Sequence, residues 1–106
     1  MSDLEEANAR LSGVTADTFE PSVTETFEIV FSDGVIPVEL VSVDRLEKRS
    51  PPGRREPFSL VFRASSDRII PQMNWTVRNA STGEQTFLAV PIGVDETGAL
   101  YQVIFN

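Results

Sequence analysis

The chain has 106 residues, a length typical of one domain with a single hydrophobic core, and it contains neither His nor Cys. This absence removes the commonest general base, the usual transition-metal ligands and the thiol nucleophile, and it excludes a disulfide framework and a Ser-His-Asp triad. Sixteen acidic and nine basic residues give a formal net charge of -7, which argues against binding nucleic acid through its phosphates. We expect one domain, residues 1–106, without a metal or other cofactor.

The N-terminal residues resemble neither a signal peptide nor a membrane anchor. Residues 1–6 are acidic where a signal peptide would be basic, and no apolar h-region follows them. No apolar run approaches the roughly 20 residues that a membrane span needs. The sequence therefore predicts a cytoplasmic protein that does not bind membranes.

A short amphipathic helix is predicted within residues 1–17, which form this helix and a lead-in to the first strand. Ser2 and Glu5 have the spacing of a capping box, and Gly13 can close the helix. One face of the helix carries Leu4, Ala7 and Leu11. Two or three turns are too short to be stable alone, so we expect this helix to dock on the sheet or on another subunit.

From Thr24 onward the apolar residues alternate with a period of two, which indicates strands. An Asp-Gly pair at residues 33–34 predicts a hairpin. Because Pro37 has no N–H, we expect a four-residue loop over 32–35 that places it at a non-hydrogen-bonded position, with a free or bulged strand edge beside it. The apolar faces then predict the cross-strand pairs Phe31–Ile36, Ile29–Val38 and Phe27–Leu40.

Four further strands are expected, and Gly-containing turns at residues 79–83 and 95–98 join the last three of them. Trp75 and Tyr101 alternate with polar neighbours, which favours core packing over a ligand-stacking platform. The fold class is all-β, a small antiparallel sandwich or barrel of five to seven strands with a short N-terminal helix. The four strands are expected at Phe58–Ala64, Met73–Asn79, Gln85–Ile92 and Ala99–Phe105.

Three stretches carry a resemblance to a known family: Phe58-Ser59-Leu60-Val61-Phe62, Pro91-Ile92-Gly93 and Tyr101-Gln102-Val103-Ile104-Phe105-Asn106. From Thr18 onward the chain resembles an uncharacterised bacterial family of β domains, about 100 residues long, whose function is unknown. That family shares the patterns Phe-Ser-Leu-x-Phe, Pro-x-Gly and a terminal Tyr-x-x-x-Phe-Asn, and its genes neighbour phage-tail-collar-like genes. The resemblance implies no reaction and no catalytic residues. It favours a structural or assembly role, phage-tail-like or at the cell surface.

The predicted hairpin register places Glu28 directly opposite Glu39 on the outer face. Like charges in a cross-strand pair destabilise it, so the arrangement needs an explanation. The two carboxylates can form a cation or acid–base site, in which crowding raises one pKa. Alternatively, Arg63 or Arg78 on a neighbouring strand neutralises them, or both are solvated, and structural pairing of this kind is the commoner case.

The segment 45–57 is unusually basic and rich in proline, with a formal charge of +3 in a chain of net charge -7. Its prolines and Gly53 oppose helix and regular strand, so we expect a long loop. It can dock an acidic partner or a second subunit, or it can be a solvated connection whose charges offset the acidic body. Its basic residues are Arg45, Lys48, Arg49, Arg54 and Arg55, and these are the candidate partner-binding residues.

These observations favour a non-enzymatic protein-interaction or assembly module that binds another protein or itself, as in a homo-oligomer. The first alternative is a small-molecule or carbohydrate-binding β domain, which a concave pocket lined by Trp75 or Tyr101 would support. The second alternative is an enzyme working through Glu28 and Glu39.

Overall fold

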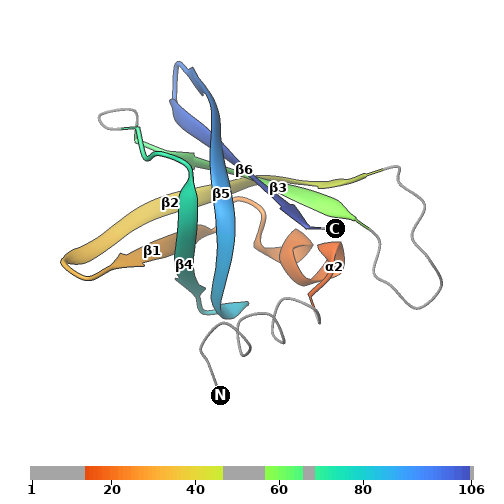
Figure 1. Cartoon of the computed structure of the whole chain (residues 1–106). Helices are drawn as coiled ribbons and strands as arrows, with labels where there is room; N and C mark the ends of the chain where they lie inside the picture. Colours follow the sequence, from red (N-terminus) through yellow and green to blue (C-terminus); the bar gives the residue numbers. More distant parts are fainter. Residues whose placement is uncertain (1–13, 47–56, 66–68, 106) are drawn as a thin grey trace.

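A computed structural model describes residues 14–46, 57–65 and 69–105 of the chain. In these residues, six antiparallel strands form a closed barrel in the order β1-β2-β3-β6-β5-β4, which confirms the predicted all-β fold (Figure 1). A short helix, α2 (Ala16–Phe19), and a 3-10 turn, η1 (Glu20–Ser22), precede the first strand. The strands are β1 (Thr26–Phe31), β2 (Gly34–Arg45), β3 (Phe58–Ala64), β4 (Met73–Asn79), β5 (Gly83–Asp95) and β6 (Gly98–Phe105).

Two long strands, β2 and β5, give the barrel its shape because each pairs with different neighbours along its two halves. The first half of β2 pairs with β1 up to Glu39, and the second half pairs with β3 from Glu39 onward. Likewise, β5 pairs with β4 up to Ala89 and with β6 from Val90. Each long strand has a bulge near its change of partner, which is how a strand turns the corner between two sheets.

The pairing pattern of the first three strands is repeated by the last three. Both sets are antiparallel meanders with a long, bulged middle strand, and the meanders join through β1 with β4 and β3 with β6. The two junctions differ in length: β1 and β4 pair at two positions, whereas β3 and β6 pair at seven. The barrel is therefore built as two similar halves, although the two halves of the sequence show no obvious repeat.

The register of the first hairpin differs from the predicted one by two residues. Phe31 pairs with Gly34, so Ser32 and Asp33 alone form the loop, and the predicted four-residue loop is wrong. Pro37 lies opposite Glu28, at a non-hydrogen-bonded position counted from the closing pair. The missing N–H thus costs no ladder bond, which is the constraint that motivated the longer loop. Pairing of β2 with β3 starts only at Glu39, so the predicted free edge beside Pro37 is confirmed for the described residues.

Aromatic side chains fill the barrel. Trp75 and Tyr101 are 1% and 0% exposed, and their rings meet edge to face with centroids 5.0 Å apart, which confirms the prediction that they belong to the core. Phe58 and Phe105 stack with centroids 4.6 Å apart. A filled interior leaves no room for a stacked ligand, so it removes the pocket on which the carbohydrate-binding alternative was based.

Helix α2 closes one end of the barrel through Phe19, which is fully buried against Phe58 and Phe105. Full burial of a phenylalanine contributes about 2–3 kcal/mol, far more than four residues of helix gain by themselves. The helix predicted over residues 2–11 lies outside the described residues. In the described part of the chain, no helix is long and apolar enough to cross a membrane.

Candidate functional site

A groove lies where the ladder between β1 and β4 opens. The two strands pair only at Glu28–Arg78 and Ile29–Val77. Continuing this register would place Asp33 opposite Met73, but the strands diverge, and both residues instead line a groove of about 440 Å³. The groove is therefore a gap between two strands that are neighbours in the barrel order.

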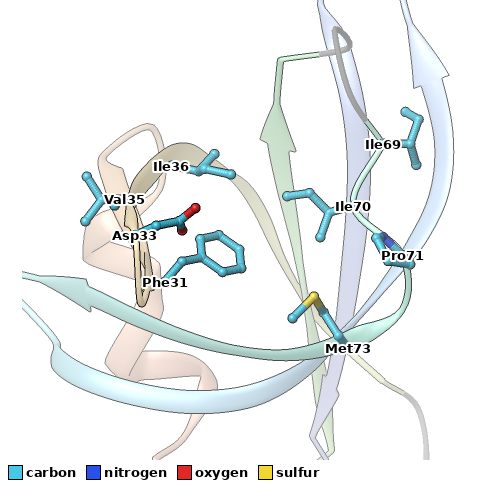
Figure 2. A pocket seen from close by; sticks show the side chains of 9 residues that line it. Phe31, Asp33, Val35, Ile36, Ile69, Ile70, Pro71 and Met73 are labelled. Atoms are coloured by element: carbon cyan, nitrogen blue, oxygen red, sulfur yellow. The ribbon is translucent and has the colours of Figure 1, made fainter.

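The groove has one wall from the tip of the β1–β2 hairpin and another from the segment 69–73 that leads into β4 (Figure 2). In Figure 2, Phe31 and Ile36 on the hairpin point toward Ile70 and Met73 on the opposite wall. Phe31 is the exception among the seven phenylalanines, because the other six are buried in the barrel and Phe31 is only half-buried. The groove thus exposes apolar surface that the core could have covered.

A buried hydrogen bond fixes the wall formed by residues 69–73. The N–H of Ile70 donates to the Tyr101 hydroxyl over 2.8 Å, and both residues are buried. Tyr101 stands on β6, so this bond ties the segment before β4 to the opposite half of the barrel. We therefore treat Tyr101 as a positioning residue for the groove.

The chemistry of the groove is almost entirely apolar. Val35, Ile69 and Met73 are 43%, 47% and 36% exposed, although each is a large hydrophobic side chain. Among the described residues that line the groove, Asp33 has the only charged side chain. Adjacent exposed apolar residues around a concave surface are typical of binding sites, whereas single exposed ones are common on any protein.

The predicted pairing of Glu28 with Glu39 is wrong. With the register shifted by two residues, Glu28 lies opposite Pro37, and Glu39 lies opposite Thr26. Each carboxylate instead accepts a hydrogen bond from an arginine of the neighbouring strand: Arg78 Nε donates to Glu28 over 2.9 Å, and Arg63 Nη1 donates to Glu39 over 3.3 Å. The alternative prediction, neutralisation by Arg63 or Arg78, is thereby confirmed. The enzymatic hypothesis loses the carboxylate pair on which it was based.

Of the five candidate partner-binding residues, only Arg45 falls within the described residues. It is the last residue of β2 rather than part of a loop, and its guanidinium donates to Asp17 and Glu20 over 2.6 and 2.7 Å. These hydrogen bonds, the one to Asp17 first, raise the pKa of Arg45 above its ordinary value. Arg45 is therefore engaged with the helical end of the chain, and its role in binding a partner stays a prediction.

The remaining candidates, Lys48, Arg49, Arg54 and Arg55, lie outside the described residues, and their role in binding stays a prediction. The ends of their segment are joined, because the Leu46 N–H donates to the Pro57 carbonyl over 3.0 Å. The basic segment is thus a connection between β2 and β3, at the end of β2 far from its groove-lining residues, Gly34–Ile36.

A second cluster of charged groups, around Asp95, is structural. Asp95 Oδ1 accepts hydrogen bonds from the Thr97 hydroxyl, the Thr97 N–H and the Gly98 N–H, at 2.7, 2.8 and 3.0 Å. The bonds from Thr97, more than the charge of Arg63, hold the pKa of the Asp95 carboxyl below its ordinary value. Asn79 makes the equivalent turn between β4 and β5, where its Oδ1 accepts from the N–H groups of Ser81 and Thr82. These polar side chains shape turns, as the turn prediction required.

The groove could not be identified from the amino-acid sequence. Its lining residues come from two stretches about 35 positions apart, and neither carries a pattern that distinguishes exposed apolar residues from buried ones. One signal was present: Ile69-Ile70-Pro71 is an apolar run placed immediately before a strand, in a connection that would ordinarily be polar.

The fold and the groove define a small closed β-barrel with an apolar groove in its wall. The chain belongs to the family described as Domain of unknown function (DUF6916), whose model matches residues 14–105. This match confirms the prediction that the chain belongs to an uncharacterised domain family. No curated protein and no solved structure matches the chain significantly.

Proposed function

We propose that this domain is a non-enzymatic protein-interaction or assembly module, and that it docks an apolar segment of a partner in the groove between the β1–β2 hairpin and residues 69–73. The observation that carries the proposal is the exposure of Val35, Ile69 and Met73 around the half-buried Phe31. Leaving these side chains in water forgoes the stabilisation that their burial would give, about 25 cal/mol per Å² of apolar surface. A partner that covers them recovers it.

The electrostatics of the molecule support a binding role at this place. The net charge of -7 favours a soluble monomer and repels acidic surfaces, while the described residues of the groove carry one charge, on Asp33. Charge repulsion therefore opposes contact with an apolar partner less at the groove than on the rest of the acidic surface. The assembly context that the family resemblance suggested, phage-tail-like or at the cell surface, belongs to this proposal and is tested with it.

The alternative function, binding of a small molecule, has one observation in its favour. A volume of about 440 Å³ is within the range of ligand pockets. However, small-molecule sites usually place several polar groups around the ligand to fix its orientation, and the part of the groove lining that the structure describes has a single charged side chain. A protein segment, whose main chain supplies its own polar groups, suits this lining better.

The test is a capture experiment from cells of the source organism with three versions of the full chain. The groove variant replaces Val35, Ile69 and Met73 with serine. The matched control variant replaces Leu88, Ile92 and Ile104, which are 47%, 50% and 54% exposed and do not line the groove. We expect the wild type and the control to retain the same partner protein and the groove variant to lose it. Equal capture by all three versions would refute docking at the groove.

A further inference from the structure

The hairpin wall of the groove offers its occupant side chains rather than main-chain groups. Phe31 and Gly34 close the two-residue hairpin, and the two residues next to such a turn form a hydrogen-bonded pair. Ile36 pairs with Ile29 two positions further along, so it is hydrogen-bonded in the same way. The main-chain groups of Val30 face the other side, where they belong to the ladder with β4. The main chain around the exposed side chains is therefore already paired.

The wall formed by residues 69–73 also lacks donors for a further strand. A strand bonds its neighbour through every second residue, so an added strand would use either residues 69 and 71 or residues 70 and 72. Pro71 has no N–H, and the N–H of Ile70 donates to the Tyr101 hydroxyl. Each of the two sets thus lacks one donor, which makes this wall a poor template for an extended segment.

An occupant of the groove must therefore satisfy its own main-chain groups, because burying an unpaired N–H or C=O group is costly. An α-helix meets this requirement, since its main-chain groups hydrogen-bond within the segment. A helix also presents apolar side chains at positions i, i+3, i+4 and i+7 as one stripe. Such a stripe suits a groove whose two walls are both apolar.

Asp33 selects the charge of the occupant. It is exposed at the hairpin turn, and in Figure 2 its carboxylate points toward the groove, in the same direction as Phe31. Asp95, at the turn between β5 and β6, uses its carboxylate to hold that turn. By contrast, within the described part of the chain no group forms a hydrogen bond or an ion pair with the Asp33 carboxylate. This carboxylate can therefore pair with a lysine or arginine, which the net charge of -7 also attracts.

Building on the proposed function, we infer that the occupant is an amphipathic, basic α-helix of a partner protein. Its apolar stripe lies against Phe31, Ile36 and Met73, and a lysine or arginine beside that stripe pairs with Asp33. The inference rests on docking at the groove, and it adds the conformation and the charge of the docked segment.

Selection from a random hexadecapeptide phage library on the full chain tests this inference, with the groove variant used for counter-selection. A helix presents residues three and four apart to one face, whereas a strand presents every second residue. We expect enriched peptides with apolar residues at i, i+3, i+4 and i+7 and a basic residue beside them. Apolar residues at i, i+2 and i+4 would overturn the helix but leave apolar docking in place. A library that yields no enrichment over the groove variant would overturn both proposals.

A proline substitution in the best enriched peptide examines its conformation directly. The substitution is made at a central position that the selected peptides leave variable, so that no contact with the groove is lost. Because proline breaks a helix interior, it should weaken binding at least about tenfold, whereas alanine at the same position should weaken it by no more than about twofold. Equal affinities of the proline and alanine peptides would overturn the helix.

Asp33→Asn tests the charge of the occupant, since asparagine also suits a turn. We expect this variant to bind the peptide about two- to fivefold more weakly at low salt, and the difference to disappear at high salt. The matched control, Asp44→Asn, removes the same charge at the other end of β2 and should leave the affinity nearly unchanged. Equal losses from the two variants would overturn the pairing with Asp33. A dimer of the wild type that the groove variant loses in sedimentation would make a second copy of this chain the occupant and overturn a separate partner.

Discussion

At the scale of single residues, Gly98 has the tightest requirement in the barrel. Its φ is +152°, and a Cβ built on it would overlap the carbonyl oxygen of Ala64 on the neighbouring strand. Gly93 lies on the same hairpin, and a Cβ there would meet nothing within 4 Å. The two glycines therefore differ in the space around them.

We expect Gly98→Ala to destabilise the domain by roughly 1–3 kcal/mol, because either β3 or the turn has to move. Gly93→Ala, the matched control, should change the free energy of unfolding by less than about 1 kcal/mol. Urea unfolding followed by the fluorescence of Trp75 measures both variants. Equal effects from the two substitutions would show that Ala64 does not constrain the turn.

Asp95 gives the barrel a specific dependence on pH. Its pKa is lower in the folded chain than its ordinary value of 3.8, first because the Thr97 hydroxyl donates to it. A carboxyl with a lowered folded pKa stabilises the fold above its unfolded pKa, and this contribution is lost as the pH falls through the folded pKa. The loss should therefore begin near pH 4 and continue below it.

We expect the unfolding midpoints of the wild type and Asp95→Asn to separate at pH 7 and to converge by about pH 2. Asparagine keeps the side-chain oxygen that caps the turn but does not titrate, so the difference between the two profiles isolates Asp95 from the other acidic residues. Parallel profiles from pH 7 to pH 2 would contradict the hydrogen-bonding account.

At the scale of elements, the segment 69–73 depends on a single buried hydroxyl. Tyr101→Phe removes the acceptor of the Ile70 N–H and leaves that donor unsatisfied, which costs about 1–3 kcal/mol. Because Ile70 lines the groove, the same substitution should also weaken capture of a partner protein at the groove. Urea unfolding of the purified variant and capture from cells of the source organism measure the two effects. A loss of stability with unchanged capture would remove Tyr101 from its positioning role.

Helix α2 is held by its apolar contact rather than by its ion pairs. Phe19→Ala should cost about 3–5 kcal/mol, since the ring is fully buried between Phe58 and Phe105. Arg45→Gln removes the bonds to Asp17 and Glu20, but these groups are exposed, and exposed ion pairs contribute little. Thermal unfolding should therefore show a large loss for the first variant and almost none for the second. The reverse order would make the ion pairs the main attachment.

The positions of the strands were largely predictable from the local alternation of apolar and polar residues. The pairing between strands was harder to predict. The strands Phe58–Ala64 and Met73–Asn79 have the predicted bounds, because alternation of apolar and polar residues is a local signal. The predicted register of the first hairpin was wrong because Phe27, Ile29 and Phe31 can face the core in either of two registers that differ by two residues. The geometry of the turn selects one of these two registers. In it, Gly34 belongs to the strand pair that closes the hairpin, opposite Phe31, and is not a loop residue.

At the scale of the whole molecule, the groove could not be predicted, because it depends on where two neighbouring strands diverge. Met73 has the same apolar character as a core residue, and nothing local distinguishes its exposure. The error about Glu28 and Glu39 was of the same kind, since their partners Arg78 and Arg63 stand on strands brought alongside by the barrel. Local sequence therefore predicts what the strands are, and the closed topology determines which side chains meet.

The central claim is that a partner protein occupies the groove, and site-specific photo-crosslinking in cells of the source organism tests it most directly. A benzoylphenylalanine at Met73 reports on the groove, and one at Ile92, on the outer wall of β5, is the control. We predict one discrete crosslinked protein from position 73 and none from position 92. Crosslinks of equal yield at both positions, or a partner found only at position 92, would contradict the account.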